Sequence, residues 1–286
     1  GWVSTETSIF LPRLITRVVL PPYLMNNIVH HFDKEQLKHM ILSSLVPMGS
    51  MILCFILFRL LAIIANVDKR HRGLFAIAGT VSNTILIGIP VNTALFGETA
   101  LPYVLLYFFA NTLFFWSFGC FILSKEGTGK RKHTIKEKLI QIFSPPLCGV
   151  LLGIAFVLLG IPMPSVLSDT CRYLGQLATP LALIFVGITL ASIAWKETHM
   201  GRDIVLGLLA RLLIAPAILF CLIRYGVTLP VNMSHVFVIQ SALPCMAVIS
   251  VMSAYYGADK EYGSTMVAIT TVVGMLTIPI WMTVLS

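Results

Sequence analysis

The chain is 286 residues long, 57% of them hydrophobic and only 11% charged, with a formal net charge of +8. Soluble domains carry about 25% charged residues, so a soluble protein of this length is excluded. No P-loop, GxSxG, HExxH or paired-carboxylate pattern occurs, and we therefore expect neither an enzyme nor a bound metal or cofactor. The positive charge indicates loops that anchor the chain at a membrane, not nucleic-acid binding.

Nine apolar stretches follow one another, each near the length of about 20 residues that crosses a bilayer. They cover residues 7–30, 39–65, 73–96, 100–124, 138–161, 168–194, 203–224, 231–257 and 262–285. All are continuously apolar, which excludes the alternating pattern of a β-barrel. We predict an all-α membrane protein with nine spans.

The lysines and arginines of the loops lie mostly on one side of these spans. That side carries Lys69, Arg70, Arg72, Lys125, Lys130, Arg131, Lys132, Lys136, Lys138, Lys196, Arg202 and Lys260. The opposite side carries Lys34 and Lys38, with Arg224 at a span end. Because positively charged loops stay in the cytoplasm, we predict that Gly1 is cytoplasmic and Ser286 outside.

The two halves of the chain resemble each other. "SNTILIGIPVNTALFGETA" (residues 82–100) is similar to "ALPCMAVISVMSAYYGADK" (residues 242–260). We assign residues 1–124 to a first repeat with four spans, 125–137 to a basic cytoplasmic loop, and 138–286 to a second repeat with five. An odd number of spans per repeat inverts the second repeat, which is typical of secondary transporters. A further opening span before residue 1 would complete a 5+5 arrangement.

Equivalent segments of the two repeats carry helix breakers beside polar residues. The breakers are Gly88 and Pro90 in the first segment and Pro244 in the second. A broken helix leaves backbone N–H and carbonyl groups unpaired, and a bilayer tolerates them only where they face protein, water or a ligand. Polar neighbours can satisfy some of them: Ser82, Asn83, Thr84, Gln240 and Ser241. Because free N–H ends favour anions, two crossing breaks would form a small anion-binding site.

These segments resemble the auxin efflux carrier family, which includes plant PIN-type carriers and bacterial malate and malonate permeases. The first family pattern is roughly Pro-Asn-Thr followed by Gly-hydrophobic-Pro, and here Asn83, Gly88 and Pro90 match while Ser82 replaces the first proline. "SALPCMAVISVMSAYYGAD" (residues 241–259) and "VGMLTIPIW" (residues 273–281) are similar to the second broken span and the last helix of the family. The similarity covers nearly the whole chain.

The resemblance implies a fold of ten helices with inverted repeats and crossed broken helices, similar to sodium/proton antiporters and bile-acid transporters. It also implies an elevator motion and a homodimer. We expect a support domain over about residues 7–65 and part of 138–224. The transport domain would contain crossover helices at about 73–96 and 231–257.

The family binds substrate carboxylates beside the Asn and Pro of the crossover, which implies this role for Asn83 and Pro244. The candidate substrate-binding residues are Ser82, Asn83, Thr84, Gln240, Ser241, Leu243, Pro244 and Cys245. Arg17 and Arg172 could attract anions to a vestibule, or they could reach an interface or helix C-terminal carbonyls. Arg59 and Arg211 lie at roughly matching positions of the repeats, so we expect a shared structural role for them.

We predict a secondary transporter of small organic anions in the cell (inner) membrane, with mono- or dicarboxylates such as malate or malonate as substrates. The acidic residues fall in loops or at span ends, so no carboxylate for ion coupling is expected at the midplane. This favours a uniporter driven by the anion gradient and membrane potential, or protons that travel on the substrate. Two alternatives stay open, namely ion-coupled symport of a larger amphipathic acid and a membrane-embedded ligand sensor.

Overall fold

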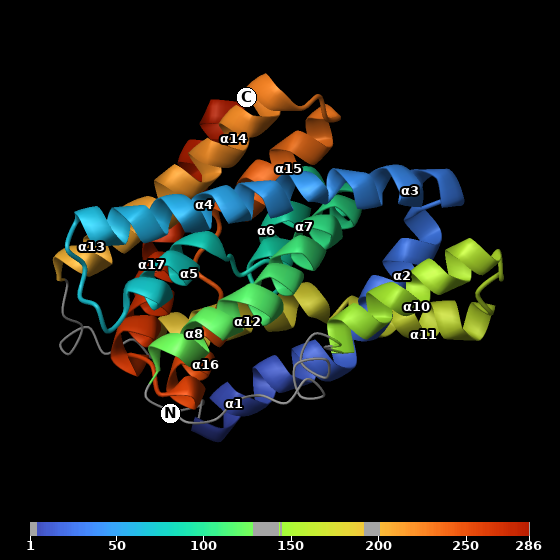
Figure 1. The fold of residues 1–286 in the computed structure, drawn as a ribbon. Helices are drawn as coiled ribbons and strands as arrows, with labels where there is room; N and C mark the ends of the chain where they lie inside the picture. Colours follow the sequence, from blue (N-terminus) through green and yellow to red (C-terminus); the bar gives the residue numbers. More distant parts are fainter. Residues whose placement is uncertain (1–4, 128–142, 144, 192–200, 286) are drawn as a thin grey trace.

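The computed structural model describes residues 5–127, 143, 145–191 and 201–285. Every regular element in these residues is a helix (Figure 1), apart from an isolated antiparallel bridge between Ser82 and Cys245. The prediction of an all-helical chain is confirmed for this part. Four helical stretches are long and apolar enough to cross a membrane: Leu45–Ile64, Glu98–Glu126, Arg202–Gly226 and Lys260–Leu285.

The elements follow the chain in this order. The first are α1 (Thr5–Leu14), the π-helical turn η1 (Ile15–Val19), α2 (Leu20–His31), α3 (Lys34–Ser43) and α4 (Leu45–Ile64). Then come α5 (Arg72–Thr80), α6 (Gly88–Phe96), η2 (Glu98–Ala100), α7 (Leu101–Phe114), η3 (Phe115–Gly119) and α8 (Cys120–Glu126). The second half contains α10 (Pro145–Leu159), α11 (Ser165–Gly175), α12 (Ala178–Ala191), α13 (Arg202–Leu209), η4 (Ala210–Ile214), α14 (Ala215–Gly226), α15 (Val231–Ala242), α16 (Val248–Tyr256) and α17 (Lys260–Leu285).

Four of the predicted spans are divided in the structure, and the one at 39–65 is divided only by a turn at Ser44 between α3 and α4. The span at 73–96 consists of α5 and α6, and the span at 231–257 consists of α15 and α16, as the breaker residues indicated. The span at 168–194 is divided into α11 and α12 by a turn at residues 176–177, which we did not predict. The start of the span at 138–161 and most of the basic loop at 125–137 lie outside the described residues.

Polar contacts bring several helix ends together at one end of the molecule. His71, just before α5, contacts Asp203 of α13 through Nε2 (3.1 Å) and Asp259, just before α17, through Nδ1 (3.2 Å). The Glu126 carboxylate at the end of α8 accepts hydrogen bonds from the first N–H groups of α5, at 2.7 Å for Leu74. The link between α14 and α15 and the C-terminus lie at the opposite end (Figure 1). Thus α5 and α15 enter the molecule from opposite ends.

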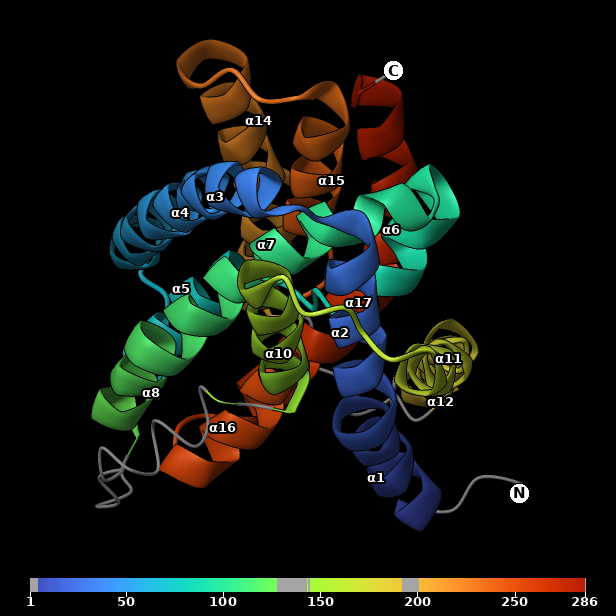
Figure 2. The ribbon, with the colours of Figure 1, turned by 90° about the vertical axis from the view of Figure 1, so that its right-hand side faces the viewer.

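The helices pack around two main hydrophobic cores. In one, α2 lies between α10 and α11 (Figure 2), where Gly149 and Gly175 allow close approach to Pro21 and Tyr23. The other core joins α4, α5, α7, α8 and α13–α17. Residues of α6 and of the first part of α7 pack against α1 and α2 in the first core. The interrupted helices therefore lie where the two groups of helices meet.

Candidate functional site

The two interrupted helices cross at their interruptions. We call residues 81–87, between α5 and α6, the first break, and residues 243–247, between α15 and α16, the second break. The Asn83 N–H donates to the Pro244 carbonyl at 2.9 Å, and the Met246 N–H donates to the Val81 carbonyl at 3.3 Å. With the bridge between Ser82 and Cys245, the breaks form a short antiparallel pair. Two segments far apart in the sequence therefore satisfy part of each other's backbone.

The second break follows from a proline and from the space made for it. Pro244 has no N–H and cannot continue α15. Its ring lies against Gly274 of α17, where a Cβ would be 2.9 Å from the proline Cγ. The next N–H, of Cys245, donates to the Thr270 hydroxyl of α17 at 3.1 Å. The break is thus supported by the helix that follows it in the chain.

The first break is held by a side chain of a neighbouring helix. The Asn111 side chain on α7 accepts from the Ser82 N–H and donates to the Ser82 carbonyl, both at 3.1 Å. These bonds replace the helical bonds that Ser82 would make. They also give the Ser82 N–H a partner within the break. Pro90 lies in the first turn of α6, where a missing N–H is tolerated.

Arg211 supplies a buried positive charge to the crossing. Its side chain is fully buried, and it projects from the π-helical turn η4. Nε donates to the Leu243 carbonyl (3.0 Å), and Nη1 donates to the carbonyls of Gly79 (3.0 Å) and Thr80 (2.6 Å). Nη2 donates to the Ser241 carbonyl. The guanidinium therefore binds the C-terminal carbonyls of α5 and α15 together.

Arg59 does not share this role, so the expectation of a common function for the two arginines was wrong. Its Nη1 lies 3.9 Å from the Glu126 carboxylate, at the end of the molecule where α5 begins. The physical reason is the different location of the two side chains. Arg59 lies beside the N-terminus of α5, whose N–H groups hold Glu126, while Arg211 lies beside C-terminal carbonyls.

Two amide side chains at the crossing are buried without a full set of partners. Gln240 of α15 is fully buried, and neither its Oε1 nor its Nε2 has a hydrogen-bond partner within the described residues. The Asn92 amide of α6 donates to the Gly88 carbonyl at 2.8 Å, but its Oδ1 has no partner there. Gly88 lies against the Gln240 amide, since a Cβ on it would be 2.6 Å from Oε1. Buried polar groups normally have partners, so this region can accept a polar ligand or water.

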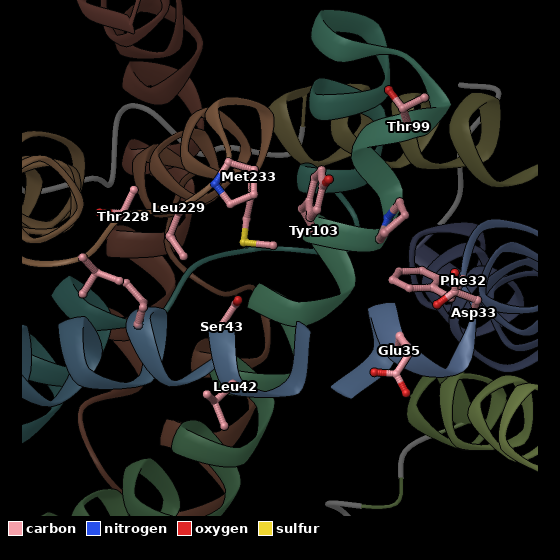
Figure 3. Close-up of a pocket in the computed structure, with 14 residues that line it drawn as sticks. Phe32, Asp33, Glu35, Leu42, Ser43, Thr99, Tyr103, Thr228, Leu229 and Met233 are labelled. Atoms are coloured by element: carbon pink, nitrogen blue, oxygen red, sulfur yellow. The ribbon is translucent and has the colours of Figure 1, made fainter. Parts of the chain in front are cut away.

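The crossing is closed to solvent in this structure. Ser82 and Gln240 are fully buried, and Asn83 is 7% exposed. An open pocket of about 790 Å³ lies elsewhere, between the α2–α3 link, the start of α7 and the α14–α15 link (Figure 3). Asp33 and Glu35 line it, and no residue of either break does. A ligand at the crossing would therefore need helices to move before it could enter or leave.

All the candidate substrate-binding residues from the sequence lie at or beside the crossing: Ser82, Asn83, Thr84, Gln240, Ser241, Leu243, Pro244 and Cys245. Arg17 and Arg172 have exposed side chains. Arg172 binds Asp169 at 2.9 Å and lies over the Tyr173 ring. Both of these contacts of Arg172 are with residues of its own helix, α11.

A family model described as membrane transport protein matches residues 1–282. The chain belongs to this family. The resemblance to auxin efflux carriers is confirmed, and the protein is a membrane transporter and not an enzyme. An uncharacterized transporter of Methanothermobacter thermautotrophicus is 26% identical to it, over 100% of this chain and 91% of that protein. A Rhizobium meliloti protein named "Putative malonate transporter" is 25% identical, over 70% of this chain and 63% of that protein.

Sequence reasoning missed the residues of this transporter that support the crossing from other helices. Asn111 and Thr270 were not singled out, although a buried polar residue in an apolar span is a candidate by default. Arg211 was noted, and helix C-terminal carbonyls were one of the roles considered for arginines in spans. Which carbonyls it binds depends on helix packing, which the sequence does not state.

Proposed function

We propose that this transporter carries small organic anions, mono- or dicarboxylates such as malate or malonate, and holds a substrate carboxylate at the crossing. The observation that carries the proposal is the antiparallel contact of the two breaks. It joins the two segments that lead into α6 and α16 inside the protein. Helix N-termini favour anions through the helix dipole. The first N–H groups of α6, of Gly88 and Ile89, already donate to the carbonyls of Asn83 and Ile85, so the contribution of α6 is its dipole. The substrate in the name of the Rhizobium relative agrees with a dicarboxylate.

The charges at the crossing support an anionic ligand. Each helix N-terminus carries about half a positive charge, and each C-terminus about half a negative charge. Arg211 binds the C-terminal carbonyls of α5 and α15, so the negative ends are neutralised. The remaining field of the two N-termini suits one carboxylate. Asn83, Thr84 and Gln240 supply neutral polar groups beside it.

We assign transport to an elevator-type movement between two groups of helices. The crossing is closed to solvent, so access needs helices to move, and an elevator movement would supply this. The framework would be α1, α2 and α10–α12, and the moving part would be the helices of the second core, with α6. In this assignment α4 and α13–α14 move with the crossing, because they pack around it. The contact between the groups is largely apolar, which favours sliding over breaking polar bonds.

The arrangement in the membrane is part of this proposal. The excess of lysine and arginine on one side would place the basic loops, including Lys69 and Arg70, in the cytoplasm and the C-terminus outside. The contacts of His71 with Asp203 and Asp259 support it, because they hold the predicted cytoplasmic ends of α5, α13 and α17 together. The homodimer and the cell-membrane location follow from the family resemblance alone.

Uptake of radiolabelled malonate and malate into proteoliposomes tests the function. We expect saturable uptake by the wild-type chain and at least tenfold lower uptake by Asn83→Ala. Asn232→Ala is the matched control, because Asn232 is exposed at the start of α15 and far from the break along that helix. Uptake by the control should equal that of the wild type.

The outcomes separate the parts of the proposal. Absence of uptake for both acids, with folded protein, would overturn the substrate class and favour a larger acid or a sensor. Equal uptake by Asn83→Ala and wild type would show that Asn83 does not contribute to substrate binding. Substrate flux that collapses with the proton gradient at constant membrane potential would contradict simple anion uniport.

A further inference from the structure

The crossing leaves backbone carbonyl groups that need partners from outside their own helices. α5 and α15 both end at the crossing, and their last carbonyls have no partner within their own helix. Inside a membrane protein such groups must be satisfied by protein, water or an ion. Two helix C-termini that meet also repel each other, since both carry partial negative charge.

Arg211 meets this need with a single side chain. It binds Gly79 and Thr80 on one interrupted helix and Ser241 and Leu243 beside the other. Guanidinium is always charged, and its donors point in fixed directions in one plane, which suits several carbonyls at once. Within the described residues Arg211 forms no ion pair with a carboxylate. Its charge is therefore balanced by helix ends.

We propose that Arg211 is a positioning residue that acts as a built-in cation and sets the geometry and charge of the carboxylate site. It occupies the place between four carbonyl oxygens that a bound alkali cation would otherwise fill. The effect of Arg211 on transport rests on the proposed function. The effect of Arg211 on the structure of the crossing does not. Because the cation is covalently attached, the site needs no sodium or potassium to present its two helix N-termini to the substrate.

The location of Arg211 explains how it controls both breaks. The carbonyls it binds directly precede, or belong to, the segments that pair at the crossing. It emerges from η4, and such π-helical turns are frequent at functional sites. Removing the guanidinium would release both C-terminal ends in one step and leave a cavity lined by carbonyl oxygens. A free guanidinium or alkali cation could then enter that cavity.

Three variants test the assignment by uptake of malonate in sodium, potassium and choline media. We expect wild-type uptake to be the same in all three. Arg211→Ala should lower uptake at least tenfold, and about 10 mM guanidinium should restore part of it. Arg211→Lys keeps the charge but has only three donors, so its KM for malonate should rise about tenfold with a smaller change in maximal rate. Arg59→Ala is the control, and guanidinium should not change its uptake.

The thermal unfolding midpoint in detergent supplies a second measurement that does not need transport. Guanidinium at the same concentration should raise the midpoint of Arg211→Ala and leave those of wild type and Arg59→Ala unchanged. If the wild type transports neither acid, the proposed function fails, while this midpoint still tests Arg211.

Several results would overturn the inference. Wild-type uptake that requires sodium would place a mobile cation in the mechanism. A folded Arg211→Ala protein that transports normally, or that gains neither uptake nor stability from guanidinium, would make Arg211 an ordinary packing residue. If Arg211→Ala does not fold, Arg211→Lys decides the question. A KM for malonate in Arg211→Lys equal to that of the wild type would also make Arg211 an ordinary packing residue.

Discussion

The two breaks that meet at the crossing are built by different means. The second break contains Pro244, whose missing N–H ends α15, and Gly274 makes room for the ring. The first break contains no proline, and it is held open by the Asn111 side chain, which binds both backbone groups of Ser82. One interruption is thus caused by the residue within it and the other by a neighbouring helix.

This difference indicates which substitutions should disrupt each break. Pro244 lacks the N–H that would continue α15 whatever surrounds it, while the Asn111 amide can hold the first break only when α7 is in place. The first break should therefore depend on α7 more strongly than the second depends on α17. Substitutions on the supporting helices test this contrast.

The largest effect is expected for Asn111→Leu. The change leaves the N–H and the carbonyl of Ser82 buried without partners, and each such group costs about 1–3 kcal/mol. We expect the free energy of unfolding to fall by about 2–4 kcal/mol, and uptake of malonate to fall at least tenfold. Chemical unfolding in detergent measures the first, and proteoliposome uptake the second.

Asn232→Leu is the control for this change, because it alters an exposed asparagine at the start of α15. It should change the free energy of unfolding by less than about 0.5 kcal/mol. Equal effects of the two substitutions would show that the first break does not depend on Asn111.

A second contrast concerns two glycines that make room at the crossing. A Cβ at Gly274 would lie 2.9 Å from the rigid Pro244 ring, so Gly274→Ala should destabilise the protein by about 1–3 kcal/mol. A Cβ at Gly88 would meet the ends of the Gln240 and Leu243 side chains, at 2.6 and 2.8 Å, and both ends can rotate, unlike the proline ring. Gly88→Ala should therefore raise the KM for malonate severalfold with little loss of stability. The free energy of unfolding and the KM for malonate should be measured for both variants. A larger loss of stability in Gly88→Ala than in Gly274→Ala would contradict this prediction.

The sequence predicted the crossing better than its supports. The apolar spans and the breakers in residues 82–90 and 240–247 were enough to place α5, α6, α15 and α16. They were enough because an interrupted apolar helix has few explanations other than a buried site. The turn between α11 and α12 was not predicted, since Gly and Pro within one apolar span are found both where a helix bends and where it ends.

The partners of the breaks could not be predicted for a different reason. A threonine in a helix commonly bonds its own preceding turn, and Thr270 does so with the Met266 carbonyl at 2.6 Å. Its second bond, with the Cys245 N–H, depends on how α17 packs. Asn111 and Arg211 are similar, because their importance comes from carbonyls on other helices and not from neighbours in the sequence.

Thr270→Val should have a smaller effect than Asn111→Leu, because it removes the acceptor of a single N–H. We expect a loss of about 1–2 kcal/mol in the free energy of unfolding, with uptake reduced less than tenfold. Thr271→Val is the matched control, since the Thr271 hydroxyl donates to the Val267 carbonyl of its own helix at 2.6 Å. A loss at Thr270 as large as that at Asn111 would contradict the proposed difference between the breaks.

The smallest effect is expected in the segments that lead into the two interrupted helices. The loop before α5 contains Asp68, whose pKa is lowered to about 2 because Arg70 donates hydrogen bonds to its carboxylate at 2.6 and 2.9 Å. The link before α15, residues 227–230, contains no acidic residue. A carboxylate with a lowered pKa stabilises the fold above its ordinary pKa of about 3.9, and this contribution is lost as the pH falls toward 2.

Asp68→Asn should therefore lower the thermal unfolding midpoint slightly at pH 7 and have no effect at pH 2. The change is small because an exposed ion pair contributes little. Glu261→Gln, at the exposed start of α17, is the control for removal of a surface carboxylate. A difference between Asp68→Asn and wild type that persists unchanged at pH 2 would not come from the charge of Asp68. It would instead indicate that the loop before α5 positions the first break through its backbone, which the Asp68 N–H joins to Asp203 at 3.2 Å.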